Sequence, residues 1–386
     1  KELLPDFKPL DFNGTCFTKT KYVARLIQAP NDETHLIAGP WLKPLVRTLK
    51  RAWHEDNWIF YGSVAPDKLN KWLARIAGCE SFFWSDYSSF DATFSSETWA
   101  MLEGFYHHIY PHAPMEFRRV LDIWRTPKGK ALVRKQNATV RYQAQVCNCS
   151  GRDDTALANA LFNGLALSTS FAAALAGKSV EDVTPADLEH ARSLCMISVV
   201  GDDSLVGCHF DVARYAEAIV AGLKQFGLVV KAEFSYELHD VTFLGMMPYR
   251  VAARTYEWGP TIGRRLYKML WMREYRSPAP WVRGVAQAMC KFANVPILSD
   301  LARKVDELLH GHNVTPVASY QDRPWTCTPT SATPWSETTL DWLCARYRGL
   351  TKAMIRQDLA NISEVTRLPC VLRLESLRVM CAQDDL

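Results

Sequence analysis

Two adjacent carboxylates stand where one apolar run of the chain turns back into another. Asp202 and Asp203 follow Gly201 inside LCMISVVGDDSLVGCH (Leu194–His209), a pattern that predicts a β-hairpin with its acids at the tip. Adjacent carboxylates repel each other, so a chain that keeps them together commonly binds a cation, and Mg²⁺ prefers such oxygen ligands. A solvated acidic turn would have the same sequence, so this tripeptide alone does not decide between the two.

A second acidic cluster lies about 110 residues earlier, in FFWSDYSSFDATF (Phe82–Phe94). Its aromatic run predicts a buried strand that ends near Asp86, and Asp91 follows five residues later across a strand-to-helix turn. Taken alone, Asp91 is better explained as a local turn or cap residue than as part of a site. Ser95 or Ser96 is expected to cap a helix that runs to about residue 110.

A third polar cluster lies between the two acidic ones, in a loop and helix over residues 149–177. Ser150 and Gly151 form a flexible turn, and Asp153 or Asp154 is expected to cap the helix. Thr155 and Asn159 are four residues apart and therefore share one face of a helix that is otherwise small and apolar. Polar groups on a buried helix need a partner, which is either a structural hydrogen bond or a bound ligand.

Cations recur with regular spacing in two further stretches. Lys19, Lys21 and Arg25 project from one face of an expected strand, which suits a row of phosphate oxygens as well as solvent. A later helix interleaves basic and aromatic side chains, a pattern typical of nucleic-acid contact and also of a solvated face. Its residues are Arg264, Arg265, Tyr267, Lys268, Trp271, Arg273, Tyr275 and Arg276.

The rest of the chain predicts a mixture of helices and strands. We expect a hairpin over 126–146, a strand over 228–234 that carries Lys231, and another strand over 241–247. Helices are expected over 115–124, from Thr184 onward, and over 211–226, 336–348, 351–362 and 372–380. Residues 313–335 are rich in Pro, Thr and Ser and indicate a long loop.

Composition limits the possible classes of protein. The 386 residues are 48% hydrophobic and 22% charged, as in ordinary globular proteins, and the net charge of +4 requires any basic surface to be local. The 11 cysteines lack zinc-site spacing and predict reduced thiols in the cytosol. No signal peptide or apolar run of membrane-spanning length is apparent. The start at Lys1 suggests a fragment or a processed product.

The order and spacing of DYSSFD, SGRDDTALAN and GDDS resemble the palm of viral RNA-dependent RNA polymerases of plus-strand RNA viruses, especially tombusvirus-like and nodavirus-like replicases. The resemblance covers roughly residues 15–250. It implies an α+β right-hand polymerase, with an antiparallel palm sheet flanked by helices and a mostly helical thumb. The implied domains are fingers and fingertips (1–80), palm (81–112), fingers (113–145), palm (146–250) and thumb (251–386).

The resemblance also implies roles for individual residues. Asp86, Asp202 and Asp203 would bind two divalent ions, Mg²⁺ or Mn²⁺, that stabilise the attacking and leaving oxygens of an in-line displacement. Lys231 would protonate the leaving pyrophosphate. Asp91 and Asn159 would read the ribose 2′-hydroxyl, with support from Thr155. Substrate and template contacts would come from Lys19, Lys21, Arg25, Ser150 and Gly151.

The implied function is that of an RNA-directed RNA polymerase, a nucleotidyltransferase of viral RNA replication and transcription. Its partners would be RNA template and product, nucleoside triphosphates and other replicase proteins. It would act in the host cytoplasm, at membrane-bound sites reached through other regions or partners, with no membrane segment in this chain. A reverse transcriptase-like enzyme is disfavoured by Asp91 and Gly201. A non-catalytic RNA-binding module is disfavoured by the three acids, and a two-metal phosphatase or nuclease has no use for the Thr155 helix.

Overall fold

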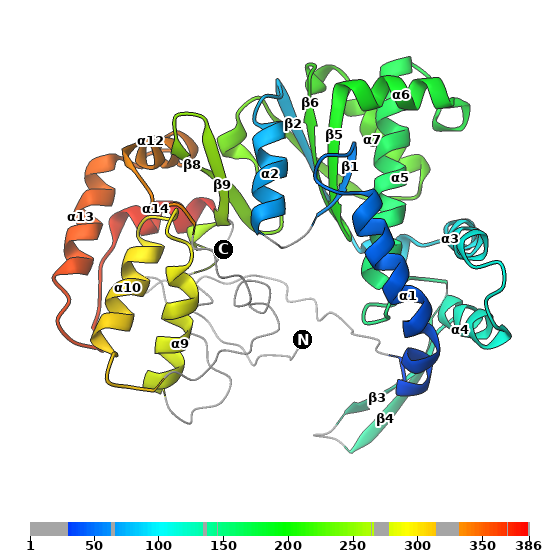
Figure 1. The fold of residues 1–386 in the computed structure, drawn as a ribbon, viewed down its shortest axis with the longest axis horizontal. Helices are drawn as coiled ribbons and strands as arrows, with labels where there is room; N and C mark the ends of the chain where they lie inside the picture. The colour runs from blue at the N-terminus through cyan, green and yellow to red at the C-terminus, as the bar shows by residue number, and fades with distance from the viewer. Residues whose placement is uncertain are drawn as a thin grey trace.

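A computed structural model describes residues 30–62, 66–133, 137–144, 146–263, 265, 278–313, 332–368 and 370–384. The predicted basic strand with Lys19, Lys21 and Arg25 lies outside these residues, as does the basic–aromatic helix apart from Arg265. So does most of the expected loop over 313–335. The described chain is a mixed α+β protein, in which a five-stranded sheet with helices against it lies beside a mostly helical C-terminal part (Figure 1).

The central sheet has five strands in the order β1-β5-β6-β2-β7. Four of them are antiparallel neighbours: β5 (Cys195–Val200), β6 (Asp203–Cys208), β2 (Ser81–Tyr87) and β7 (Val230–Ser235). The fifth, β1 (Ile59–Tyr61), pairs in parallel with β5 at the edge. The expected antiparallel pairing is therefore present in four strands, and a short strand from the N-terminal part adds a parallel pairing at the edge.

One face of the sheet packs against helices α5 (Thr155–Ala176) and α7 (Ala216–Gln225), and α6 (Pro185–Leu194) lies beside α5. Phe83 of β2 contacts Phe171 of α5 edge to face, with ring centroids 5.5 Å apart. Among the described residues α5 alone has the length and composition of a membrane span, but 78% of its most apolar window is buried inside the protein. It is therefore packed as a core helix.

The opposite face of the sheet is covered at one end and exposed at the other. Phe82 of β2 is buried with Trp72 of α2 (Pro66–Ile76) and with Trp258 of β9 (Thr255–Pro260). Exposure then increases along β2, through the half-buried Trp84 to the exposed Asp86. This gradient leaves the Asp86 end of the sheet open to solvent.

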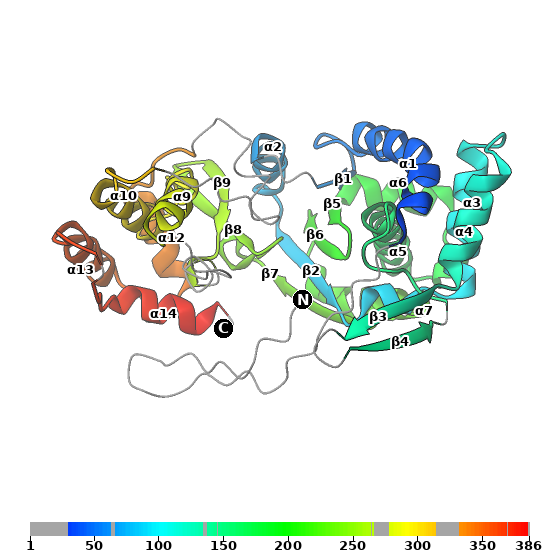
Figure 2. The ribbon, with the colours of Figure 1, turned by 90° about the horizontal axis from the view of Figure 1, so that it is seen from below.

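The remaining N-terminal elements lie beside the sheet. They are α1 (Asp32–Ala52), the 3-10 turn η1 (Phe90–Thr93), α3 (Ser96–Ile109), α4 (Met115–Arg125) and a hairpin of β3 (Lys128–Val133) and β4 (Ala138–Gln143). Ser95 caps α3 through its side chain, as predicted. Figures 1 and 2 show that the β3–β4 hairpin projects from this part of the molecule.

The C-terminal part has a hydrophobic core of its own and is mostly helical. It contains β8 (Met246–Ala252), β9, α9 (Pro278–Cys290), α10 (Leu298–Leu308), α12 (Glu337–Arg346), α13 (Lys352–Ser363) and α14 (Glu375–Gln383). The predicted strand over 241–247 was wrong, because Leu244 and Gly245 have positive φ and turn the chain, so that β8 starts at Met246. The polymerase domain division remains a prediction.

Close packing of α5 against α7 gives a test of this core. A Cβ atom on Gly222 would lie 2.9 Å from the Cβ of Ser170, closer than real carbons approach. We expect Gly222→Ala to lower the free energy of unfolding by about 1–3 kcal/mol, measured by urea denaturation.

Gly104 of α3 is the matched control, because a Cβ there meets no atom within 4 Å. Gly104→Ala should raise stability by about 0.5–1 kcal/mol through helix propensity. Equal stability changes in the two variants would contradict the close α5–α7 approach.

Candidate active site

The pairing of β2 with β6 brings the two predicted acidic clusters together. Ser85 lies directly opposite Ser204, and their hydroxyl oxygens are 2.5 Å apart. In an antiparallel pair, the residue after Ser85 on β2 lies opposite the residue before Ser204 on β6. Asp86 therefore lies beside Asp203. Asp86 and Asp203 are exposed, whereas Asp202, in the adjoining turn, is half-buried.

The turn that carries Asp202 is a tight two-residue connection. Val200 and Asp203 are paired across β5 and β6, so Gly201 and Asp202 alone form the loop. Gly201 has a φ of +65°, a conformation that two-residue hairpins require and that glycine adopts without strain. The predicted hairpin with its acids at the tip is confirmed.

The side chain of Asn163 ties this turn to β2. Its Nδ2 donates to the carbonyl oxygens of Gly201 and Asp202 at 3.1 and 3.0 Å, and its Oδ1 accepts from the Tyr87 hydroxyl at 2.8 Å. Burial raises the pKa of Tyr87 to about 12, so the hydroxyl remains a donor. Sequence analysis missed Asn163, although it lies four residues after Asn159 on the same helical face.

Asp91 and Asn159, predicted to act together, are in direct contact. The Nδ2 of Asn159 donates to the Oδ1 of Asp91 at 2.9 Å, and its Oδ1 accepts from Asn148 at 2.5 Å. The backbone N–H of Asn148 also donates to the carbonyl oxygen of Asp91. Asn148 is buried, and no described residue donates to its Oδ1. Sequence analysis missed Asn148 because nothing in its local pattern distinguishes it.

Thr155 stabilises the loop before α5. Its hydroxyl donates to the carbonyl oxygen of Cys149 at 2.7 Å and accepts from the backbone N–H of Arg152 at 3.1 Å. The support that Thr155 was expected to give Asp91 or Asn159 is therefore indirect. Its hydrogen bonds close the turn at Ser150 and Gly151, where Gly151 has a φ of +108°.

The same loop contains a fully buried ion pair that sequence analysis did not anticipate. The guanidinium of Arg152 donates to both carboxylate oxygens of Asp154, with a shortest distance of 2.6 Å. It lies between the rings of Trp99 and Trp124, at 4.4 and 4.7 Å from their centroids. The Tyr106 hydroxyl donates to Asp154 as well.

Asp154 occupies the N-cap position of α5, but its carboxylate makes no capping hydrogen bond. The expectation that Asp154 caps this helix was wrong, because the side chain turns inward to Arg152. Asp153, the other candidate, pairs with His35 of α1 at 2.8 Å. Both acids thus fasten the loop to neighbouring elements.

Lys231 lies on β7 directly opposite Asp86 and is exposed. Lys231, Asp86 and Asp203 therefore occupy neighbouring positions on three adjacent strands. Within the described chain, Lys231 and Asp86 do not form an ion pair with each other, and both side chains are exposed to solvent.

The described residues contain no group of three or more His, Cys, Asp or Glu side chains that is already arranged around a metal position. Asp86, Asp202 and Asp203 do offer carboxylate oxygens, the donors that Mg²⁺ and Mn²⁺ prefer. Two of these donors are exposed on neighbouring strands, where ligand phosphate oxygens could complete a coordination sphere. The donor set thus suits hard divalent ions.

Comparison with known proteins gives no assignment for this chain. No family model matches it, and no curated protein is significantly similar to it.

The buried Arg152–Asp154 pair predicts a strongly non-additive double-mutant cycle. Arg152→Met or Asp154→Leu alone should lower the free energy of unfolding by about 3–5 kcal/mol, because each leaves an uncompensated buried charge. In urea denaturation, the free energy of unfolding should fall less in the double variant than in either single variant.

Arg192→Met provides the control, because Arg192 forms an exposed ion pair with Glu189. Loss of this ion pair should lower the free energy of unfolding by no more than about 1 kcal/mol. Additive losses in the Arg152 and Asp154 variants would contradict the coupling.

Proposed function

We propose that this protein is an RNA-directed RNA polymerase that adds nucleoside triphosphates to RNA by a two-metal mechanism. The observation that supports the proposal most strongly is the register of β2 against β6, which sets Asp86 beside the Gly201–Asp203 turn. The acids are far apart in the sequence, yet they meet at the open end of one sheet, as the resemblance to viral polymerases requires.

The proposed chemistry needs carboxylates on neighbouring strands. Two divalent ions about 3.5–4 Å apart can stabilise both the attacking and the leaving oxygen of a phosphoryl displacement. Asp86 and Asp202 would bind these ions, and Asp203 would assist. Lys231 would protonate the pyrophosphate, a role supported by its position opposite Asp86.

The Asp91–Asn159 pair would select ribose. A 2′-hydroxyl both donates and accepts, and a carboxylate beside an amide can satisfy both functions. The buried Oδ1 of Asn148, next to this pair, supplies a further acceptor. In this proposal the partners are RNA template and product, nucleotides and other replicase proteins, in the host cytoplasm.

The metal role can be tested with isosteric amides. Asp86→Asn or Asp202→Asn should lower Mg²⁺- or Mn²⁺-dependent incorporation of labelled NTP by roughly a hundredfold or more, since the ions supply several kcal/mol of stabilisation. RNA binding by either variant should stay within about twofold of wild type. The assay uses an RNA template with and without primer.

Asp122→Asn is the matched control, because Asp122 is exposed on α4 and away from the sheet. Full synthesis by the Asp86 or Asp202 variant would refute the metal assignment. Incorporation of dNTP in preference to NTP would instead identify a reverse transcriptase, and RNA binding without synthesis by the wild type would identify a binding module.

The sugar role gives a separate prediction. Asn159→Leu removes the amide at similar volume, so discrimination between NTP and dNTP, as the ratio of their kcat/KM values, should fall about tenfold. Asn361→Leu on α13 serves as the control. A ratio equal to that of the wild type in Asn159→Leu would eliminate Asn159 as a sugar-reading residue.

A further inference from the structure

The segment around the β3–β4 hairpin carries an unusual excess of positive charge. Residues 123–151 contain three arginines, three lysines and no Asp or Glu, whereas the whole chain has a net charge of only +4. These cations are Arg125, Lys128, Lys130, Arg134, Lys135 and Arg141. The positive charge of the protein is therefore concentrated near this hairpin.

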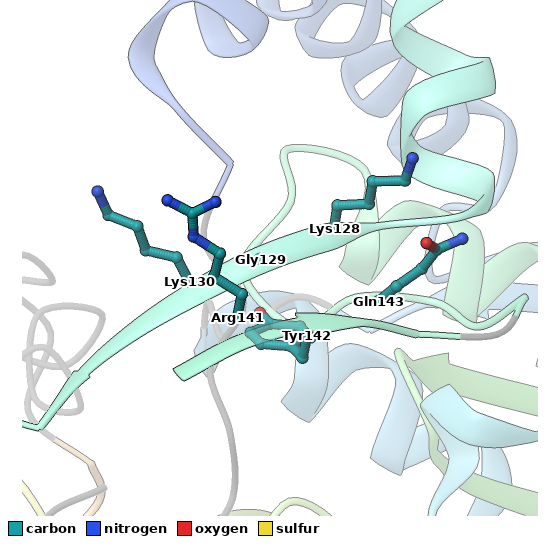
Figure 3. Close-up of a pocket in the computed structure, with 6 residues that line it drawn as sticks. All are labelled: Lys128, Gly129, Lys130, Arg141, Tyr142 and Gln143. Carbon is teal, nitrogen blue, oxygen red and sulfur yellow. The ribbon is translucent and has the colours of Figure 1, made fainter. Parts of the chain in front are cut away.

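Three of these cations share one face of the hairpin. Lys128 is opposite Gln143 and Lys130 is opposite Arg141, and residues directly opposite each other, or two apart on a strand, point to the same side. All four side chains are exposed. Figure 3 shows them leaving the hairpin on the same side. We call Lys128, Lys130, Arg141 and Gln143 the basic hairpin face.

Gly129 and Tyr142 lie opposite each other on the two strands of the hairpin and approach closely. A Cβ atom on Gly129 would overlap the ring of Tyr142, so glycine allows the ring to lie across the strand. An open hollow of about 470 Å³ is lined by both residues and by the basic hairpin face (Figure 3).

Within the part of the chain that the structure describes, the cations of this face have no acidic partners, because no ion pair includes Lys128, Lys130 or Arg141. Several other exposed cations do lie beside an acid: Arg192, Arg214 and Arg378 each pair with an acid three residues away. Neighbouring like charges on a strand pair repel each other, and a bound polyanion would relieve that repulsion.

We propose that the basic hairpin face binds the sugar–phosphate backbone of single-stranded RNA. Side chains two apart on a strand are about 6.6–6.8 Å apart, and those on the neighbouring strand about 5 Å, so the face presents closely spaced donors to successive phosphates. Lys and Arg bind phosphate oxygens, and Gln can donate to phosphate or sugar.

The position of the hairpin favours RNA as its partner. Gln143 ends β4, and five residues later Asn148 donates to Asn159, so a short segment joins the basic hairpin face to the candidate active site. An RNA strand held on this face would be close to that site. The choice of RNA over other polyanions rests on the proposed polymerase function.

The test is RNA binding by the triple variant Lys128→Gln, Lys130→Gln, Arg141→Gln. Fluorescence anisotropy with a labelled, unstructured RNA of 12 nucleotides, at a series of KCl concentrations, gives Kd and its salt dependence. We expect Kd to rise at least about tenfold near 100 mM salt. The slope of log K against log salt should fall by about 2, because three phosphate contacts release roughly 0.7 counterion each.

The control is the triple variant Arg192→Gln, Arg214→Gln, Arg378→Gln, which removes the same charge from cations that have acidic partners. Its Kd should stay within about twofold of wild type. Unchanged RNA affinity of the hairpin variant, or an equal loss in the control, would overturn the proposal. The proposal would also be overturned if the hairpin variant no longer bound phosphatidylserine vesicles but kept its affinity for RNA. That result would assign the face to a membrane.

Failure of this proposal is distinguishable from failure of the polymerase function. The anisotropy measurement needs no catalysis, so it decides the hairpin role even if the protein synthesises no RNA. If synthesis is observed, the hairpin variant should raise KM for RNA with kcat unchanged, whereas Asp202→Asn should abolish kcat and leave Kd unchanged.

Discussion

The hydrogen bonds of one buried amide hold the candidate site together. Asn163 binds the Tyr87 hydroxyl at the end of β2 and two carbonyl oxygens in the Gly201–Asp202 turn. Leaving a buried polar group unpaired costs about 1–3 kcal/mol, so strand, turn and helix cannot separate without that loss. The positions of Asp86 and Asp202 are thereby fixed relative to α5. Asn159, one turn earlier on α5, fixes Asp91 in the same way.

The two faces of the central sheet differ in packing and in exposure to solvent. The helix-covered face is dry and close-packed, with the α5–α7 contact at Gly222 and the ring contacts of Phe171. The other face becomes exposed toward Asp86, where charged side chains can meet solvent and ligands. Because a rigid helix supports the turn from behind, exposed carboxylates can remain in place despite their mutual repulsion.

Local patterns predicted much of this fold. The hairpin with its glycine turn, the strand that ends near Asp86 and the Ser95 cap each depend on residues close in sequence. The pairing of Ser85 with Ser204 joins residues 119 positions apart, and only tertiary folding fixes such a register. The same holds for the parallel strand β1 and for Arg152, whose aromatic and acidic partners come from separate elements. Asp154 shows the limit of capping rules, because a buried arginine competes for its carboxylate.

Positive and negative side chains are gathered in separate regions, the basic hairpin face and the carboxylates around Asp202. A polyanion would be attracted to the basic hairpin face but repelled by the carboxylates around Asp202, so it could approach them only after divalent cations neutralise that charge. The Arg152–Asp154 pair, held between Trp99 and Trp124, anchors the chain where it enters α5. On this basis the hairpin would set where an RNA strand lies, and the cations would determine whether that strand reaches the acids.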